Sequence, residues 1–206
     1  MDRNEQLAVG RRLLGHIDGR TTDLADALFR NRVDAYACRE RAARERDALF
    51  RSQPLFMGLS SRMPRPGDFI TEDVAGLPVL LVRGPDGAVR AFANICRHRG
   101  APVAEGCGNA RAFVCPYHGW TYNNEGELVG VAASNEFGEF DRDEYALPAL
   151  PTLERAGLIW AVLDPNSTID IEAFLSGYDD MLSHFNFDKW YLFDSRVLRG
   201  PNWKVA

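Results

Sequence analysis

The stretches CRHRGAP, at residues 96–102, and CPYHGW, at residues 115–120, decide how the middle of this sequence folds. Each stretch contains one cysteine and one histidine, and sixteen residues separate His98 from Cys115. Thiolates and imidazoles are ligands of zinc and of iron–sulfur clusters. Two such pairs on neighbouring loops of a β-domain can enclose a metal centre from opposite sides. The four predicted ligands are Cys96, His98, Cys115 and His118.

Two kinds of metal centre fit this ligand set. Four ligands of these types can hold one tetrahedral zinc ion. They can also hold a [2Fe–2S] cluster, with both cysteines on one iron and both histidines on the other. Zinc fingers usually pair cysteine with cysteine and histidine with histidine along the chain, whereas each stretch here carries one of each. This distribution favours the two-iron cluster, with a structural zinc module as the alternative.

Residues next to the predicted ligands have expected roles around the metal centre. Gly100 and Gly119 follow the ligands, and glycine lets backbone N–H groups approach cluster sulfurs closely. Trp120 can cover one side of the centre and keep water out. Arg97 and Arg99 flank a ligand, where they either stabilise negative charge on the reduced centre or are ordinary surface arginines.

The two stretches resemble the cluster-binding loops of a Rieske [2Fe–2S] domain. With two ferric ions, two sulfides, two thiolates and two neutral imidazoles, the oxidised cluster would be neutral, and the reduced cluster would carry one negative charge. The resemblance therefore implies a one-electron carrier with a potential above that of plant-type ferredoxins. Because ferric iron acidifies its imidazole ligands, we expect this potential to depend on pH near or above neutrality.

The sequence departs from one branch of this family and is similar to another. Rieske subunits of respiratory complexes carry an extra cysteine in each loop, joined as a disulfide, and Ala101 and Tyr117 stand at those places here. Tyr117 is instead expected to lie beside the cluster. The motifs GDF at residues 67–69 and NWK at residues 202–204 resemble the α subunit of aromatic-ring-hydroxylating Rieske non-haem iron oxygenases. A stand-alone Rieske electron-transfer protein without oxygenase activity is the second interpretation.

The oxygenase resemblance implies a relay of electrons. In that family a ferredoxin or reductase reduces the Rieske cluster, which passes electrons to a mononuclear Fe(II), usually in a neighbouring subunit of a trimer. That iron is held by two histidines and a carboxylate, and it activates O2 to hydroxylate the substrate. We expect a homotrimer, or a hexamer of three α and three β subunits, with an acidic ferredoxin docking near Arg97 and Arg99.

The two remaining histidines do not supply the mononuclear iron site. His16 and His184 each stand without another histidine nearby in the sequence. The ligands of that iron are therefore expected beyond Ala206, and no catalytic residue is assigned within this chain. We expect the 206-residue chain alone to hydroxylate nothing.

The pattern of apolar residues predicts three segments: residues 1–53 are expected to be helical, residues 54–165 to form an antiparallel β-domain, and residues 166–206 to begin with a helix. The resemblance implies an α+β fold in which residues 54–165 are the Rieske domain and residues 166–206 begin a truncated α+β catalytic domain. Helices are predicted around residues 7–17, 33–50 and 171–185, the last with Asp170 as its N-cap. Strands are predicted at residues 68–74, 77–82, 88–93, 110–114, 121–122, 128–129, 152–154, 158–163 and 190–198.

The composition excludes several classes of protein. Hydrophobic residues make up 46% of the chain and charged residues 26%, as in a globular rather than a disordered protein. A net charge of −5 argues against nucleic-acid binding. The longest apolar runs have six residues, where a membrane helix needs about 20, and the N-terminus has no apolar signal segment. We therefore expect a cytoplasmic protein, in which Cys107 is a spare loop thiol and Cys38 is a small core residue.

Overall fold

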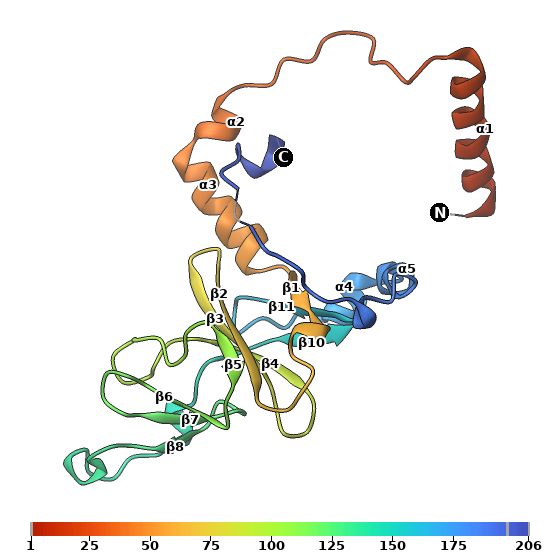
Figure 1. Ribbon diagram of the computed structural model, residues 1–206. Helices are drawn as coiled ribbons and strands as arrows, with labels where there is room; N and C mark the ends of the chain where they lie inside the picture. The colour runs from red at the N-terminus through yellow and green to blue at the C-terminus, as the bar shows by residue number, and fades with distance from the viewer. Residues whose placement is uncertain (1, 197, 206) are drawn as a thin grey trace. The chain divides into compact units, whose positions relative to one another are not determined.

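Residues 2–196 and 198–205 are described by a computed structural model of the chain. The chain divides into two compact units, residues 1–38 and residues 39–206, and each is described by itself. The helices and strands of both units are drawn in Figure 1. In the described residues, no helix combines the length and the apolar character needed to cross a membrane.

The first unit contains α1 (Arg3–Gly19) and the short α2 (Asp34–Ala37). A capping box begins α1: the Asp2 carboxylate accepts hydrogen bonds from backbone N–H groups of the first turn, and the Glu5 carboxylate accepts one from the Asp2 N–H. The helix predicted around residues 7–17 is therefore confirmed. None of the residues of α1 is buried, so packing contributes little to holding this helix.

The second unit opens with α3 (Arg39–Glu45), which continues as a π-helical turn (Arg46–Arg51). The helix predicted over residues 33–50 is not continuous. It is interrupted at Cys38, whose backbone is extended with φ −73° and ψ 120°. The apolar spacing thus predicted helical structure correctly but did not predict this break.

The C-terminal turn Trp203–Val205 packs on the segment formed by α3 and the π-helical turn. Lys204 Nζ donates hydrogen bonds of 2.6 and 2.7 Å to the Glu45 carboxylate. The Trp203 ring meets the Phe50 ring edge-on, with centroids 5.4 Å apart. The hydrogen bond from Lys204 lowers the pKa of Glu45. These contacts join two segments that are far apart in the sequence.

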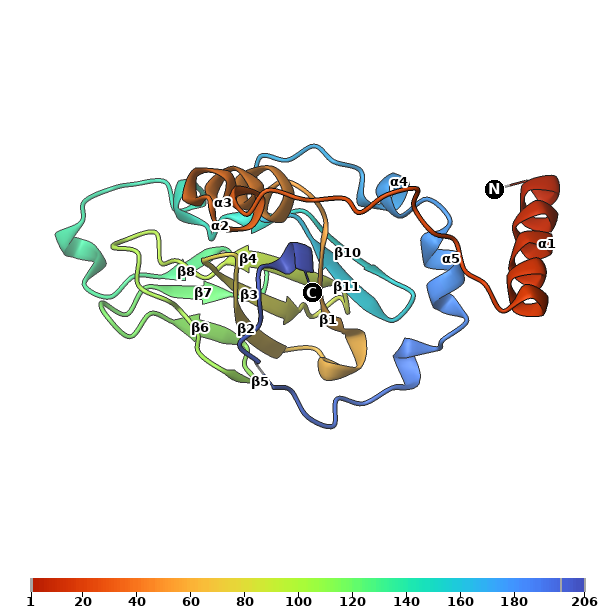
Figure 2. The ribbon, with the colours of Figure 1, turned by 90° about the horizontal axis from the view of Figure 1, so that it is seen from above.

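The described part of the second unit contains three antiparallel sheets. Their strands are β1 (Leu55–Leu59), β2 (Asp68–Val74), β3 (Leu77–Arg83), β4 (Val89–Ala93), β5 (Cys107–Asn109), β6 (Ala112–Val114), β7 (Thr121–Asn123), β8 (Leu128–Gly130), β9 (Ala149–Leu150), β10 (Thr152–Arg155) and β11 (Leu158–Ala161). The strand orders are β1-β11-β10, β5-β2-β3-β4-β9 and β6-β7-β8. Figures 1 and 2 show the five-stranded sheet between the two three-stranded sheets.

Strand β3 joins two hydrophobic cores because both of its faces are buried. Val79 and Leu81 belong to the core shared with β1 and β11. Leu80 and Val82 point the other way, into the core that contains Cys96. A strand that is buried on both faces has a continuous run of apolar residues instead of an alternating pattern, and β3 has such a run. The predicted cysteine ligand therefore lies in one of the two cores of the β-domain.

All eight strands predicted for the β-domain are confirmed, with bounds that differ by at most two residues at either end. They are β2, β3, β4, β6, β7, β8, β10 and β11. The structure adds β1, β5 and β9, which the sequence patterns did not predict. Two of these are short edge pairings: β5 has three residues and pairs with β2, and β9 has two residues and pairs with β4.

The helix predicted over residues 171–185 is two helices, α4 (Ile171–Leu175) and α5 (Tyr178–Ser183). Residues 176–177 separate them with positive φ values of 23° and 82°, which an α-helix cannot accommodate. The predicted N-cap is confirmed, because the Asp170 side chain accepts a hydrogen bond of 3.0 Å from the backbone of α4.

The strand predicted at residues 190–198 is wrong for residues 190–196 and 198, which form no strand; residue 197 lies outside the described residues. Tyr191 and Phe193 are 79% and 89% exposed, and no neighbouring strand pairs with them. The run of apolar residues at 190–193 suggests a strand, but a strand also needs a partner to receive its backbone hydrogen bonds.

Candidate metal centre

The two cysteine–histidine stretches form loops on the same core. The first loop follows β4, and the second connects β6 to β7. Cys96 and Cys115 are free thiols, with only 3% and 2% of their surface exposed. Both belong to the core between the five-stranded sheet and the β6-β7-β8 sheet. The fold thus brings two segments that are well separated in sequence to one place.

The two loops have the same backbone turn. In each loop the cysteine N–H donates to the carbonyl five residues later, and a glycine N–H donates back to the cysteine carbonyl, at 2.8–3.0 Å. These glycines, Gly100 and Gly119, have φ values of 78° and 69°, in the left-handed region that favours glycine. Their N–H groups therefore close the turns, a more specific role than the close approach to sulfur that we expected.

The loops bring the two predicted histidine ligands into contact, with one ring edge-on to the other. The ring centroids of His98 and His118 are 4.6 Å apart, with their planes at 62°. The Nδ1 atom of His98 is buried and has no hydrogen-bond partner in the described residues. Burial lowers the pKa of His98, and the neighbouring His118 and Arg99 lower it further. A neutral imidazole with an unpaired buried nitrogen is suited to bind a metal.

These residues fit a [2Fe–2S] cluster with two thiolate ligands and two imidazole ligands. Two buried free thiols, a pair of adjacent imidazoles and an unpaired ring nitrogen supply that donor set. A cluster of this kind takes two protein ligands on each iron. Within residues 2–196 and 198–205, no three His, Cys, Asp or Glu side chains are grouped as the ligands of a single metal ion.

Each histidine is stacked on a different aromatic ring. Trp120 stacks on His98, with centroids 5.0 Å apart and planes at 11°. Tyr117 stacks on His118 at 3.8 Å and 27°. Trp120 is only 2% exposed, as expected for a residue that shields the centre, whereas Tyr117 is 59% exposed. The first histidine therefore has a buried neighbour and the second an exposed one.

Tyr122 is a residue of the site that the sequence analysis missed. It is fully buried, its hydroxyl accepts a hydrogen bond of 3.0 Å from the Arg97 N–H, and it lies 3.5 Å from Cys96 Sγ. Burial and the contact with Cys96 raise the pKa of Tyr122, so the hydroxyl keeps its proton and can donate it to a thiolate. The sequence spacing could have indicated that Tyr122 belongs to the site. Trp120 directly precedes β7 and Tyr122 lies in it, and side chains two residues apart along a strand face the same side.

Asn94 is a second missed residue, and it closes the base of the first loop. It is 3% exposed, and its Oδ1 accepts hydrogen bonds from the N–H groups of Val103 and Ala104, at 2.9 and 3.2 Å. Its Nδ2 donates to the Ala104 carbonyl at 2.8 Å. One buried side chain thus ties the two ends of the loop together.

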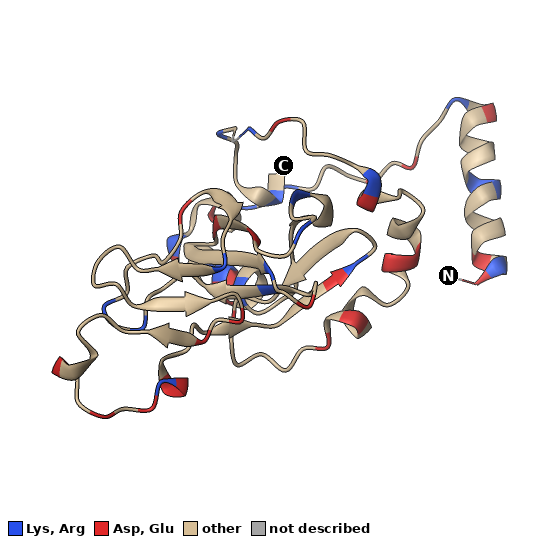
Figure 3. Cartoon of the chain, turned by 60° about the horizontal axis from the view of Figure 1, so that its bottom comes forward, with Lys and Arg blue, Asp and Glu red and all other residues tan. Residues whose placement is uncertain are grey.

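Charges of both signs surround the loops. Arg97 and Arg99 are exposed, as either of the two expected roles requires. The segment of residues 131–146 lies close to the same loop, because its Phe137 contacts His98. Its acidic residues gather on and between two short turns, seen in Figure 3: Glu136, Glu139, Asp141, Asp143 and Glu144.

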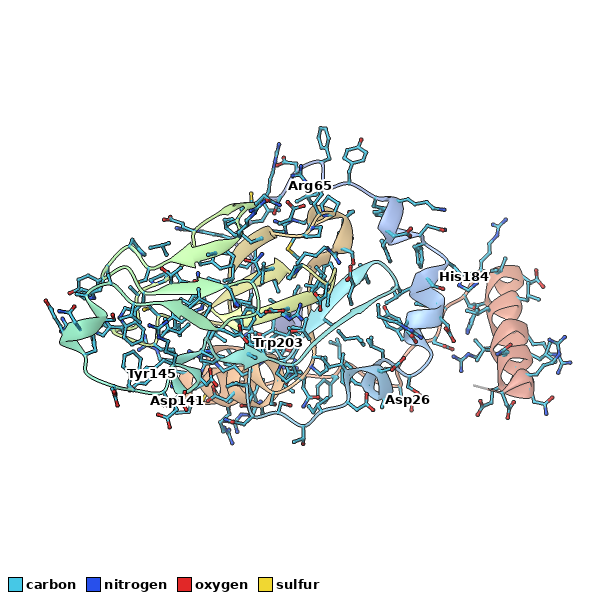
Figure 4. The ribbon with its side chains drawn as sticks, turned by 90° about the horizontal axis from the view of Figure 1, so that it is seen from below. Asp26, Arg65, Asp141, Tyr145, His184 and Trp203 are labelled. Carbon is cyan, nitrogen blue, oxygen red and sulfur yellow. The ribbon has the colours of Figure 1, made fainter. Side chains whose placement is uncertain are left out.

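The remaining cysteines and histidines lie on other elements. Cys107 is exposed on β5, and Cys38 is half-buried. His16, in the first unit, forms an ion pair of 2.8 Å with Asp23. His184, labelled in Figure 4, follows α5, and its Nδ1 lies 2.7 Å from a backbone carbonyl of that helix.

Comparison with known proteins identifies the domain. Residues 53–151 match the family model described as the Rieske [2Fe–2S] domain. The chain is 31% identical over 167 residues to the glycine betaine monooxygenase oxygenase subunit of Chromohalobacter salexigens, covering 80% of this chain and 37% of that protein. It is 34% identical over 142 residues to the chlorobenzene dioxygenase subunit alpha of a Cupriavidus species, covering 68% of this chain and 31% of that protein.

Solved structures agree with these relatives. The fold is similar to the crystal structure of a quaternary ammonium Rieske monooxygenase in complex with an inhibitor, with a TM-score of 0.71 and 29% identity. That match covers 77% of this chain and 44% of the other. The chain spans less than half the length of the relatives and structures named here.

Proposed function

Because this chain contains a Rieske [2Fe–2S] domain and its relatives are Rieske oxygenase subunits, we propose that it is the electron-accepting part of a Rieske oxygenase α subunit. The cluster would be held by Cys96, His98, Cys115 and His118. The observation that carries this proposal is the pair of matched loops, which bring two buried thiols and two adjacent imidazoles together from separate parts of the chain.

When bound, a Rieske cluster supplies one-electron redox chemistry. The protein's contribution is to bind, shield and hydrogen-bond. The glycine turns hold each cysteine at the core, and Trp120 keeps water from one face of His98. The Tyr122 hydroxyl donates a hydrogen bond toward Cys96 Sγ, which favours the more negative state of a thiolate ligand. Arg97 and Arg99 are proposed to stabilise negative charge on the solvent side of the first loop.

The proposed partners are a ferredoxin or reductase as electron donor and a mononuclear non-haem iron as acceptor. The full protein is proposed to form a homotrimer, or a hexamer of three α and three β subunits. An aromatic substrate was expected from the sequence. The names of the relatives include both a glycine betaine monooxygenase and a chlorobenzene dioxygenase, so quaternary ammonium compounds stand beside aromatic ones as proposed substrates. A stand-alone electron carrier is not favoured, because these relatives are oxygenase subunits.

Reconstitution tests the proposed ligands. After anaerobic loading with iron and sulfide, we expect two irons and two acid-labile sulfides per chain and the EPR spectrum of a reduced Rieske cluster. Cys96→Ser and His118→Ala are each expected to abolish this spectrum, and Cys107→Ser, which changes an exposed thiol on β5, should keep it. A normal Rieske spectrum in either ligand variant, or a zinc-loaded protein that takes up no cluster, would contradict the assignment.

Electron acceptance is tested with the loaded chain and a physiological type of donor. With NADH and the reductase of a related Rieske oxygenase, we expect the visible absorbance of the cluster to bleach and to recover in air. We expect no hydroxylated product from chlorobenzene or from glycine betaine with this chain alone. Product formation by the purified chain would overturn the proposed division of roles.

A further inference from the structure

The segment of residues 131–146, between β8 and β9, covers one side of the first ligand loop, and we call it the cover segment. It contains two short turns, Ser134–Glu136 and Asp143–Tyr145, and positive φ values at Ala133 and Gly138. Figure 1 shows its first turn extending beyond the β6-β7-β8 sheet, and Figure 4 labels its Tyr145. Nothing in the electron-relay role described above uses this segment.

The cover segment places aromatic rings around Trp120. The Phe140 ring lies parallel to Trp120, with centroids 6.0 Å apart, and the Tyr145 ring meets Trp120 edge-on at 5.5 Å. The Phe137 ring also meets Trp120 edge-on, at 5.8 Å. Three rings therefore hold the indole that stacks on His98.

Phe137 also contacts the predicted ligand itself. Its ring is perpendicular to the His98 ring, at 82°, with centroids 5.5 Å apart. His98 thus has Trp120 on its face and the Phe137 ring beside it. No ring of the cover segment has a described contact with His118, whose stacking partner is the exposed Tyr117.

A small cavity lies beneath this cover. Its volume is about 200 Å³, and it is lined by Arg97, His98, Trp120, Phe137, Phe140 and Tyr145. Phe137 is 41% exposed, whereas Trp120 is 2% exposed, so Phe137 is the ring that stands between this cavity and solvent. The cavity is already partly open and His98 is partly exposed, so removing the Phe137 ring would widen this space and admit more water beside His98.

We propose that Phe137 is a positioning residue for the cluster: its ring fixes the orientation of His98 against Trp120 and limits the water that reaches that ligand. This rests on the proposed cluster ligands. The oxidised cluster is neutral and the reduced cluster carries one negative charge. Water stabilises the charged state more than the neutral one, so a cover that excludes water holds the reduction potential below its water-exposed value.

Three variants test this role in the cluster-loaded chain. Phe137→Ala is expected to raise the midpoint potential and to broaden the EPR signal, because His98 gains both water and freedom to rotate. Phe137→Leu keeps an apolar cover and is expected to restore the potential to near that of the unmodified protein. Phe174→Ala is the matched control, since Phe174 is a similarly exposed phenylalanine on α4 (51%), and it should change neither quantity.

A second measurement needs no variant. Pulsed EPR of the reduced protein in D2O counts exchangeable deuterons near the cluster, and we expect fewer beside His98 than beside His118. An unchanged potential in a folded Phe137→Ala, an equal shift in Phe137→Leu, or equal deuteron coupling at the two histidines would each overturn the proposal. If instead the unmodified protein gives no Rieske signal, the proposed cluster ligands themselves are wrong, which separates the two failures.

Discussion

The two ligand loops share a backbone but not an environment. Both place a buried cysteine at the start of a turn that a glycine with positive φ closes through the same two hydrogen bonds. In the first loop, His98 is stacked on a buried indole and Cys96 lies beside the Tyr122 hydroxyl. In the second, His118 is stacked on the exposed Tyr117. The common turn brings ligands together, and the side chains around it make the two loops unequal.

The different surroundings of the two loops fit two requirements of electron transfer. An electron carrier must hold its centre away from water and still present an edge to its partners. The first loop, with its aromatic cover, is suited to shield the centre from water. The second loop, with its exposed ring, is suited to face a partner.

The largest expected effect distinguishes the two turn glycines. Any alanine in the left-handed region costs roughly 1–2 kcal/mol. A Cβ at Gly119 would also lie 3.1 Å from the Ala132 Cβ, and such overpacking costs about 1–3 kcal/mol more. A Cβ at Gly100 would meet nothing closer than 4.0 Å. We therefore expect Gly119→Ala to lower the free energy of unfolding more than Gly100→Ala does.

Denaturant unfolding of the cluster-loaded protein measures this difference. Gly87→Ala serves as the control for backbone strain alone, because Gly87 has φ 83° in a hairpin turn and no atom within 4 Å of an added Cβ. Gly100→Ala and Gly87→Ala should behave alike. Equal losses for Gly100→Ala and Gly119→Ala would show that the surroundings of the two turns do not differ as described.

A smaller effect is expected at Asp68, which anchors the chain between the two loops. Its carboxylate is 5% exposed and accepts hydrogen bonds from Asn109 Nδ2 at 2.8 Å and from the Arg65 N–H at 2.9 Å. Burial acts to raise the pKa of Asp68, but the hydrogen bonds from Asn109 and Arg65 outweigh it, and the pKa is lowered. Asp68→Asn should cost about 1–3 kcal/mol at neutral pH, because it disrupts buried hydrogen bonds.

The sign of the pH dependence follows from the lowered pKa. A carboxyl whose pKa is lower in the folded state stabilises the fold above its unfolded value of 3.8, and this contribution is lost as the pH falls through the folded pKa. The stability difference between the unmodified protein and Asp68→Asn should therefore be largest near neutrality and shrink below about pH 4. Asp188→Asn, at an exposed site, is the control. A stability difference that is constant from pH 3 to pH 7 would contradict the claim that the ionised Asp68 carboxylate stabilises the fold.

The smallest expected effect is at Tyr122, whose hydroxyl contacts Cys96 and Arg97 of the first loop. Tyr122→Phe removes the hydroxyl that lies 3.5 Å from Cys96 Sγ. A hydrogen bond to a thiolate stabilises the reduced cluster, so its loss should lower the potential by about 40 mV, corresponding to about 1 kcal/mol. Tyr117→Phe keeps the ring on His118 and should leave the potential unchanged. If a redox titration showed equal shifts of the reduction potential in Tyr122→Phe and Tyr117→Phe, the proposed difference between the loops would be wrong.

The proposed ligands could be picked out in the sequence because their chemistry is local. Cysteine and histidine at short spacing in two loops are visible without any knowledge of packing. The strands β2, β3 and β4 were predictable for a similar reason, since the turns between them contain Gly76 and Gly87. The structure brings the predicted loops together on one core.

The features that were not predicted depend on distant parts of the chain. β5 and β9 are too short to show alternation, and they exist because β2 and β4 offer an edge to pair with. Residues 190–193 form an apolar run that suggests a strand, but the described residues offer them no such edge. Phe137 contacts His98 only because the cover segment folds back on the first loop. Tertiary contacts, rather than local propensity, decide each of these cases.

The central claim is that four residues from two matched loops hold one cluster with two unlike irons. Mössbauer spectroscopy of the chain reconstituted with ⁵⁷Fe tests it most directly. We predict two iron populations of equal area, one with sulfur ligands only and one with sulfide and imidazole ligands, and reduction should localise the added electron on the second. A single iron population, or iron bound without sulfide, would contradict the account.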